Sequence, residues 1–193
     1  MSSTAGIHPT PASLARYSPP VAWIAPEIDR IETLSVADER PMLQSWLDYH
    51  RQTLLLKCAG LDPAQLGQRC VAPSKISLHG LIRHLTENER GWFRVTAAGE
   101  PLDYLYCSET NPDGDFDDVP TADPATDLAT YHRERALADA AVAPLPLDHR
   151  CHHPVTGTEY TLRWIYLHMI EEYARHNGHA DFLRERIDGR TGQ

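Results

Sequence analysis

The chain has 193 residues, of which 41% are hydrophobic and 23% are charged, as expected for a folded protein with a single domain. Its formal net charge of −9 and the lack of a basic run argue against nucleic-acid binding, because phosphate backbones are also negative. No apolar run reaches the ~18 residues of a membrane span, and the first residues lack the pattern of a secretory signal. Four scattered cysteines without a CxxC pair favour reduced thiols in the cytoplasm.

Residues 1–34 are rich in Pro, Ser and Ala and show no sustained hydrophobic period. We therefore expect them to form an irregular N-terminal arm, partly anchored by Trp23 and Ile24. The remaining residues, 35–193, are expected to fold as one helical domain.

The first helix is predicted over residues 35–60, where apolar residues recur at helical spacing. Ser35 and Asp38 are spaced as in a capping box, with Asp in place of the usual Glu. Gly60 is a typical residue to end such a helix.

A second helix is predicted over residues 77–99, with Ser77 as its cap and an apolar face behind it. A long acidic segment with many turn residues follows, and it is interpreted as a solvated loop that could cover a pocket. The third helix is predicted from Asp123, a typical cap followed by Pro124, to Pro144.

A short hairpin is predicted over residues 150–162, with its turn at Thr156 and Gly157. The last helix is predicted from Thr161 to Gly189, because glycine commonly stops a helix. Four amphipathic helices with little strand signal predict an all-α fold, a four-helix bundle with a long loop between the second and third helices.

Two polar residues lie on the apolar side of the last helix. On a wheel of about 100° per residue, His176 lies roughly 20° and Glu172 roughly 60° from the centre of that side. They are four residues apart, so their side chains are neighbours. A buried carboxylate needs protonation, an ion pair or a bound cation. The pair can bind a divalent metal with one more histidine, or it can hydrogen-bond within the bundle; the wheel does not decide between these interpretations.

Several histidines can supply the third ligand. His50 lies well inside the apolar face of the first helix, whereas the wheel puts His84 roughly 120° from the apolar centre of the second helix. His168 and His179 flank the apolar face of the last helix. Periodicity alone therefore slightly favours His50 over His84.

Two stretches, LIRHLTENERGWF at 81–93 and LHMIEEYARHNGHADFLRE at 167–185, resemble the DinB/YfiT-like superfamily of helical bundles. Within it, the chain is most similar to the branch related to mycothiol-dependent maleylpyruvate isomerase, over residues 37–192. The resemblance implies a four-helix bundle in which three side chains hold one divalent metal ion. Many relatives use three histidines, whereas the isomerase branch has Glu at the first HxxxH position, as E-Y-A-R-H does here.

Carried over position by position, the resemblance implies His84, Glu172 and His176 as the metal ligands, and it overrides the preference for His50. The residues that it leaves as candidates for the pocket or for contacts to the ligands are His50, Asn88 and His179. Zinc is the expected ion, with nickel, iron and manganese as alternatives, because all four accept mixed nitrogen and oxygen ligands.

The resemblance further implies an S-transferase or isomerase that uses a small thiol such as mycothiol to attack a small electrophile. A metal-dependent hydrolase and a non-catalytic metal-binding stress-response protein are the alternatives. A homodimer is expected by analogy with relatives, and neither nucleic acid nor a membrane is expected as a partner.

Other signals are interpreted as structural. Cys151, His152 and His153 are adjacent in an extended segment, so their side chains point to opposite sides and converge poorly on a metal. Glu87 and Glu89 are expected to be solvated charges on a helix flank. Helical spacing of the tryptophans indicates packing rather than a substrate surface, at Trp46, Trp92 and Trp164.

Overall fold

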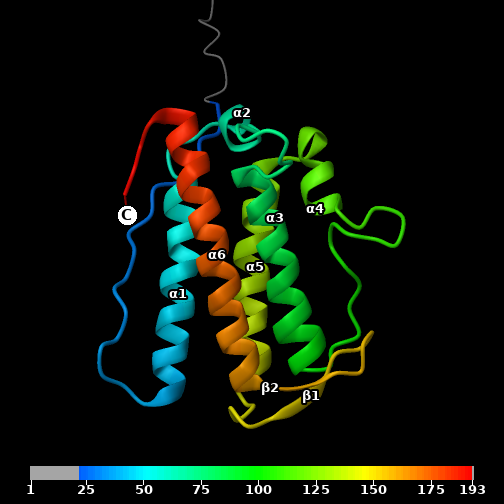
Figure 1. The fold of residues 1–193 in the computed structure, drawn as a ribbon. Coiled ribbons are helices and arrows are strands. Elements are labelled where there is room, and N and C mark those ends of the chain that lie inside the picture. The colour runs from blue at the N-terminus through cyan, green and yellow to red at the C-terminus, as the bar shows by residue number, and fades with distance from the viewer. Residues whose placement is uncertain (1–21, 193) are drawn as a thin grey trace, which may run out of the picture.

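The computed structural model describes residues 22–192. The helical elements are α1 (Glu39–Cys58), α2 (Pro63–Leu66), α3 (Leu78–Asn88), the π-helix η1 (Glu89–Ala97), α4 (Gly114–Asp117), the 3₁₀-helix η2 (Val119–Thr121), α5 (Pro124–Val142) and α6 (Leu162–Asp188). Strands β1 (Arg150–His152) and β2 (Glu159–Thr161) pair antiparallel. The long elements α1, α3 with η1, α5 and α6 lie side by side (Figure 1), which confirms the predicted all-α bundle. Among the described residues, no helix is long and apolar enough to cross a membrane.

Residues 22–38 form neither helix nor strand and run along α1 (Figure 1). The amide of Ala25 donates to the carbonyl of Leu61 at 2.9 Å, which ties this segment to the far end of α1. Trp23 packs against the core as predicted, whereas Ile24 is exposed. The first 21 residues of the predicted arm lie outside the described part of the chain.

Most helix ends fall where the sequence predicts them, at Ser77, Asp123 and Gly189. The start of α1 differs, because the helix begins at Glu39 and the predicted capping box is wrong. Asp38 has extended backbone dihedrals (φ −62°, ψ 158°) and is itself the N-cap, so Ser35 lies outside the helix. The loop predicted between the second and third helices contains two short helices, α4 and η2, which the sequence pattern did not indicate.

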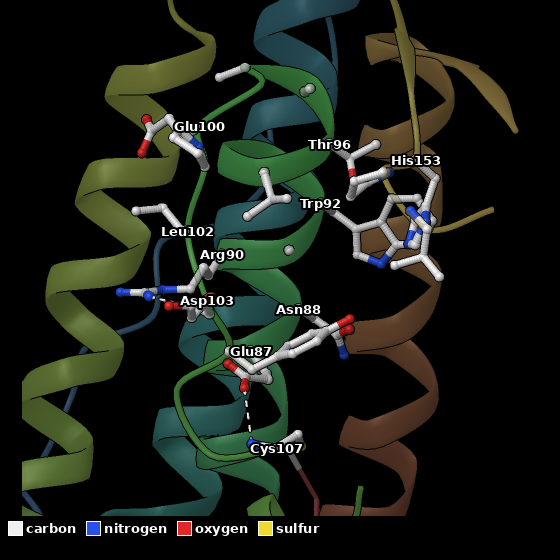
Figure 2. Close-up of a pocket in the computed structure, with 18 of the residues that line it drawn as sticks. Glu87, Asn88, Arg90, Trp92, Thr96, Glu100, Leu102, Asp103, Cys107 and His153 are labelled. Carbon is white, nitrogen blue, oxygen red and sulfur yellow. Dashed lines mark hydrogen bonds between the residues drawn. The ribbon is translucent and has the colours of Figure 1, made fainter. Parts of the chain in front are cut away.

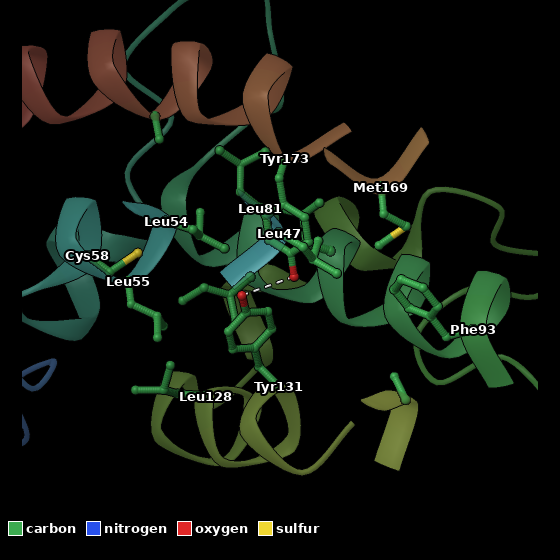
Figure 3. Packing of buried hydrophobic residues seen from close by; sticks show 14 of the residues in the cluster. Leu47, Leu54, Leu55, Cys58, Leu81, Phe93, Leu128, Tyr131, Met169 and Tyr173 are labelled. Atoms are coloured by element: carbon green, nitrogen blue, oxygen red, sulfur yellow. Dashed lines mark hydrogen bonds between the residues drawn. The ribbon is translucent and has the colours of Figure 1, made fainter. Parts of the chain in front are cut away.

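The core fills the space between the four long elements with leucines and aromatic rings (Figure 3). Two tyrosines lie fully buried at its centre, and the hydroxyl of Tyr173 is 3.0 Å from that of Tyr131. Burial raises the pKa of Tyr173 well above its usual range, so this hydroxyl keeps a proton to donate. It donates to Oε1 of Glu89 at 2.7 Å.

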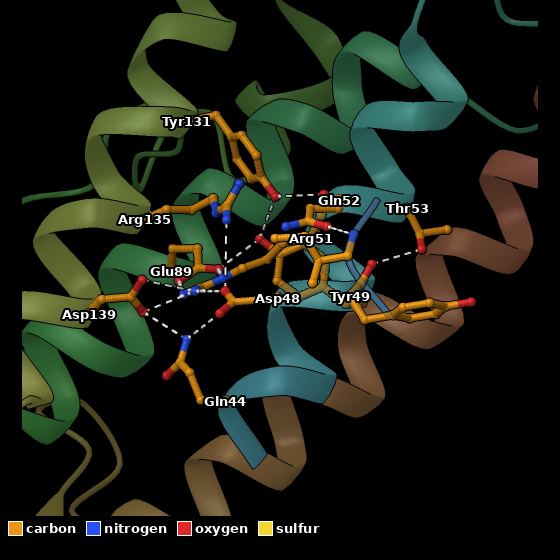
Figure 4. A network of polar contacts seen from close by, with 12 residues as sticks. Gln44, Asp48, Tyr49, Arg51, Gln52, Thr53, Glu89, Tyr131, Arg135 and Asp139 are labelled. Atoms are coloured by element: carbon orange, nitrogen blue, oxygen red, sulfur yellow. Dashed lines mark hydrogen bonds and ion pairs between the residues drawn. The ribbon is translucent and has the colours of Figure 1, made fainter. Parts of the chain in front are cut away.

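Glu89 belongs to a buried polar network that joins the helices (Figure 4). Arg51 of α1 donates from Nε and Nη2 to its two carboxylate oxygens, each at 2.7 Å, and neither side chain is exposed to solvent. Arg51 also donates to Asp139 of α5 at 2.9 Å and to Asp48 at 2.9 Å. The expectation that Glu89 is a solvated charge is therefore wrong, because its countercharge lies across the bundle on α1.

Candidate metal centre

The three implied metal ligands converge where α3 faces α6. Nε2 of His176 lies 3.4 Å from Oε2 of Glu172, and Nε2 of His84 lies 4.0 Å from the same oxygen. The two imidazole rings have centroids 4.7 Å apart. One donor atom from each residue lies within 4.8 Å of the others, a spacing that a single ion can bridge after small side-chain shifts.

Among the described residues, Glu172 has no direct ion pair with a lysine or arginine, and Arg175 acts on it only at longer range. The side chain of Glu172 is only 16% exposed. Burial, and then the neighbouring His84 and His179, lower the pKa of His176 to about 4, so this imidazole is neutral near pH 7. A neutral imidazole keeps a lone pair for a metal. The donor set of two imidazoles and one carboxylate therefore fits a divalent cation, which would also neutralise Glu172.

Two contacts orient the His84 ring toward Glu172. Nδ1 of His84 lies 2.8 Å from Oδ2 of Asp115, a carboxylate that is only 5% exposed. The amide nitrogen of Asn88 lies 3.0 Å from Nε2 of His84. Together they place the hydrogen on Nδ1 and the lone pair on Nε2. A carboxylate behind a ligating imidazole fixes its orientation and increases its basicity.

Asp115 reaches His84 because α4 is seated tightly on α3. The guanidinium of Arg83 donates to the carbonyl of Asp115 at 2.9 Å and to that of Gly114 at 3.0 Å. A Cβ atom at Gly114 would lie 2.1 Å from the carbonyl oxygen of Tyr106, so only glycine fits there. The interpretation of this segment as a solvated loop is wrong at Asp115. Sequence reasoning missed it, because the contacts that bring Asp115 to His84 join distant parts of the chain.

The residues assigned to the surroundings of the ligands have different positions. Nδ1 of His179 lies 3.3 Å from Nδ1 of His176, on the solvent side of the ring. His50 instead faces Asn177, whose amide nitrogen lies 3.4 Å from Nδ1 of His50. Within the described residues no contact joins His50 to the three implied ligands. Asn88 and His179 thus touch the implied ligands, and His50 does not.

A second group of donors adjoins the first. His168, Glu171 and Glu172 each offer one donor atom within 4.8 Å of the others. Glu171, however, pairs with Arg175 and its side chain is 48% exposed, so its charge is already balanced. Among the described residues, no donor group of this kind includes Cys151 or its histidine neighbours.

A cleft of about 1340 Å³ opens beside His84 (Figure 2). Asn88 and Trp92 line it from α3 and η1, β1 and the residues after it form one end, and the segment after η1 forms another wall. The buried carboxylate of Glu87 holds that wall by accepting hydrogen bonds from the backbone amides of Leu105, Tyr106 and Cys107. Glu87 is therefore not the solvated charge that was expected.

A helical bundle with this donor group between α3 and α6 defines a protein of the DinB/YfiT-like class, as the resemblance implied. A family model described as mycothiol-S-transferase matches residues 42–189, and the chain belongs to this family. Neither among curated proteins nor among solved structures does anything match the chain. The family indicates a small-molecule thiol as substrate.

Proposed function

We propose that this protein is a metal-dependent S-transferase that joins a mycothiol-type thiol to a small electrophile. The observation that carries the proposal is the carboxylate of Glu172, which lies between two imidazoles without a direct ion pair; one of them, His84, lines a cleft, and the chain belongs to the mycothiol-S-transferase family. His84, Glu172 and His176 hold the ion in this proposal. Zinc is favoured, with nickel, iron and manganese as alternatives, because all accept this donor set.

A divalent cation bound there supplies positive charge that lowers the pKa of a coordinating thiol, so that thiolate forms near pH 7. The chain supplies the rest. Asp115 orients His84 so that its Nε2 would be available to an ion, and Asn88 would release its hydrogen bond to that nitrogen if an ion were bound. The amide of Asn88 is then free to hydrogen-bond a substrate in the cleft.

The transfer itself is a displacement or an addition at carbon. A carbon–sulfur bond forms with the electron pair of the thiolate. In a displacement the leaving group departs with the electron pair of its bond to carbon, and the thiol proton passes to water. In an addition the electron pair of the double bond moves to the neighbouring atom of the electrophile, which takes up a proton from water. The cleft beside His84 is large enough for a thiol and an electrophile together.

The test compares neighbouring glutamates on α6. Protein purified without chelator is analysed for bound metal, and the loss of mycothiol is measured after an electrophile is added. Wild type and Glu171→Ala are expected to hold about one ion per chain and to consume thiol, because Glu171 faces solvent and pairs with Arg175. Glu172→Ala is expected to lose both the ion and the activity. Thiol consumption that is unchanged in Glu172→Ala would overturn the proposal.

The same assays separate the alternatives. Cleavage of esters or amides without thiol would identify a metal-dependent hydrolase. A loaded ion with no activity in any assay would identify a non-catalytic metal-binding protein. The proposal also includes a cytoplasmic location, supported by four free cysteines, and a homodimer; cell fractionation and light scattering test these two parts.

A further inference from the structure

A group of aromatic rings lies one helical turn from the candidate metal centre. It comes from η1, β2 and α6, and we call it the four-ring cluster: Trp92, Tyr160, Trp164 and His168. Tyr160 and Trp164 have ring centroids 4.3 Å apart. Trp164 stacks on His168 at 4.9 Å with an interplanar angle of 17°. The edge of Trp92 meets His168 at 4.6 Å.

The cluster continues the two helix stripes that carry the metal donors. On α6 the stripe consists of residues four apart, which share one face: Trp164, His168, Glu172 and His176. On α3 and η1 it consists of His84, Asn88 and Trp92. Contacts across the interface join His84 to His176 and, further along, Trp92 to His168. The donor atoms of His168 and Glu172 lie within 4.8 Å, so the cluster adjoins the centre.

Part of the cluster faces open space. Trp164 is 41% exposed, although a large apolar ring normally lowers its free energy by burial. Trp92 lines the cleft together with His153, and Figure 2 shows these two side chains next to each other beside α6. His153 contacts Trp92 at 5.8 Å between centroids. The rings therefore form a wall that reaches from the cleft to solvent, not a sealed core.

The charge of the residues that line the cleft limits which ligands can bind there. The arginines among them are Arg90 and Arg150, and carboxylates neutralise both of them, Glu134 at 3.0 Å and Glu159 at 2.9 Å. Six carboxylates line the cleft: Glu87, Glu100, Asp103, Glu109, Asp113 and Asp115. Away from the proposed metal ion, a negatively charged guest would meet repulsion from these carboxylates, because both arginines of the lining are already paired. An uncharged planar ring can stack on the tryptophans without this cost.

We propose that the four-ring cluster binds the acceptor substrate of the transfer reaction, and that this acceptor is a planar aromatic electrophile without negative charge. The identification of the bound ring as the acceptor rests on the proposed function, whereas the binding of an aromatic ring to the cluster does not depend on it. About one helical turn, or roughly 6 Å of rise, separates His168 from Glu172, so a ligand ring that lies at the His168 end of the cluster is close to the donors. In this proposal the four-ring cluster has a role beyond the packing that the helical spacing of its tryptophans indicates.

The first experiment measures binding without chemistry. The probe is 2,4-dinitrotoluene, which is uncharged and unreactive toward thiols, and its dissociation constant is measured by ligand-observed NMR without mycothiol. Trp164→Ala is expected to weaken binding about fivefold to tenfold. The matched control is Trp46→Ala, because Trp46 is equally exposed (42%) and lies on α1, which contributes no ring to the four-ring cluster. Equal binding by wild type and Trp164→Ala, or equal losses in both variants, would overturn the proposal.

The second experiment uses the transfer reaction with mycothiol and two electrophiles. With 1-chloro-2,4-dinitrobenzene a carbon–sulfur bond forms, chloride leaves with its electron pair and the thiol proton goes to buffer. Iodoacetamide reacts similarly but has no ring. Trp164→Ala is expected to lower kcat/KM about fivefold for the aromatic electrophile and to leave iodoacetamide unchanged. A similar loss for both electrophiles would refute the subsite.

The two proposals fail separately. If neither electrophile reacts but dinitrotoluene binding still depends on Trp164, the aromatic site stands and the transferase function falls. If transfer proceeds but neither binding nor kcat/KM responds to Trp164→Ala, the function stands and the aromatic site falls. Binding of 2,4-dinitrobenzoate as tight as that of dinitrotoluene would refute the exclusion of negative charge.

Discussion

Glu89 and Glu172 are both shielded carboxylates inside one bundle, and their surroundings differ in one respect. Glu89 is fully buried and receives two hydrogen bonds from Arg51 and one from Tyr173. The Glu172 side chain is 16% exposed and has two imidazole nitrogens at 3.4 and 4.0 Å as its nearest partners. Arg51 supplies the countercharge for Glu89, whereas Glu172 has no direct cationic partner among the described residues.

This difference separates structure from function within the molecule. The Arg51 network ties α1 to η1 and α5, so it fixes how the helices pack. The donor group around Glu172 connects α3 and α6 and opens to a cleft. A complete network favours one rigid arrangement, whereas an incomplete one favours a ligand that completes it. Substitution of Glu89 should therefore reduce the stability of the fold, whereas substitution of Glu172 should mainly reduce metal binding.

The largest effect is expected at the buried pair. Glu89→Gln leaves the guanidinium of Arg51 without its main partner and should reduce the free energy of unfolding by about 3–5 kcal/mol, measured by urea denaturation. The double variant Arg51→Met with Glu89→Met removes both charges and should lose less than the single variant. If the double variant loses more, the network stabilises the fold beyond the pairing of charges, and the contrast with Glu172 weakens.

Metal should distinguish the second carboxylate from the first. In chelator, Glu172→Gln is expected to change the free energy of unfolding by less than about 0.5 kcal/mol, because no ion pair is lost. Zinc at a hundred times its dissociation constant should stabilise wild type by about 2.7 kcal/mol and leave Glu172→Gln unchanged. Thermal unfolding with and without zinc measures both effects. A loss in chelator as large as that of Glu89→Gln would contradict the comparison.

Asp115 should increase the metal affinity of the centre through its hydrogen bond with His84. Asp115→Asn keeps a carbonyl oxygen for the Nδ1 hydrogen of His84 but removes the charge, so metal affinity should fall about 10- to 100-fold with the three ligands intact. Competition with a chromophoric chelator gives the affinity. Asp117→Asn is the control, since Asp117 lies on the same short helix but pairs with Lys75 at the surface. Equal affinities in the two variants would exclude this role of Asp115.

The smallest effect is expected at the wall of the cleft. Glu87→Gln replaces charge-assisted hydrogen bonds to backbone amides with neutral ones, at a local cost of about 1–2 kcal/mol. Amide hydrogen exchange should accelerate at Leu105, Tyr106 and Cys107 while the core stays protected. Glu109→Gln, an exposed lining residue, should change nothing, and uniform acceleration through the chain would mean that Glu87 supports the whole fold.

Local signals in the sequence were sufficient for much of the fold. Helical spacing and the caps at Ser77, Asp123 and Gly189 depend on neighbouring residues, so they could be read without the tertiary structure. His84 could not be found this way. The wheel assumes one buried face, but α3 packs against α5, α4 and α6, and nearly its whole surface is covered. Position within the family supplied what periodicity missed.

The residues that escaped prediction owe their environment to distant parts of the chain. Glu89 is buried because Arg51, on another helix, reaches it. Asp115 is one of several acids in its segment, and nothing local marks which of them turns inward. The π-helical geometry of η1 likewise has no simple sequence pattern. These are long-range effects, and a single sequence carries little information about them.

Gly114 has a practical consequence for anyone who redesigns this protein. Because its missing methyl group lets two loop backbones touch, even Gly114→Ala would push the chain at Tyr106 outward and take the neighbouring aspartate with it. The imidazole of His84 would then lose its contact with Asp115, although no ligand had been altered. Grafting the three ligands onto another bundle without this close backbone contact would transfer the donor atoms but not the orientation of His84.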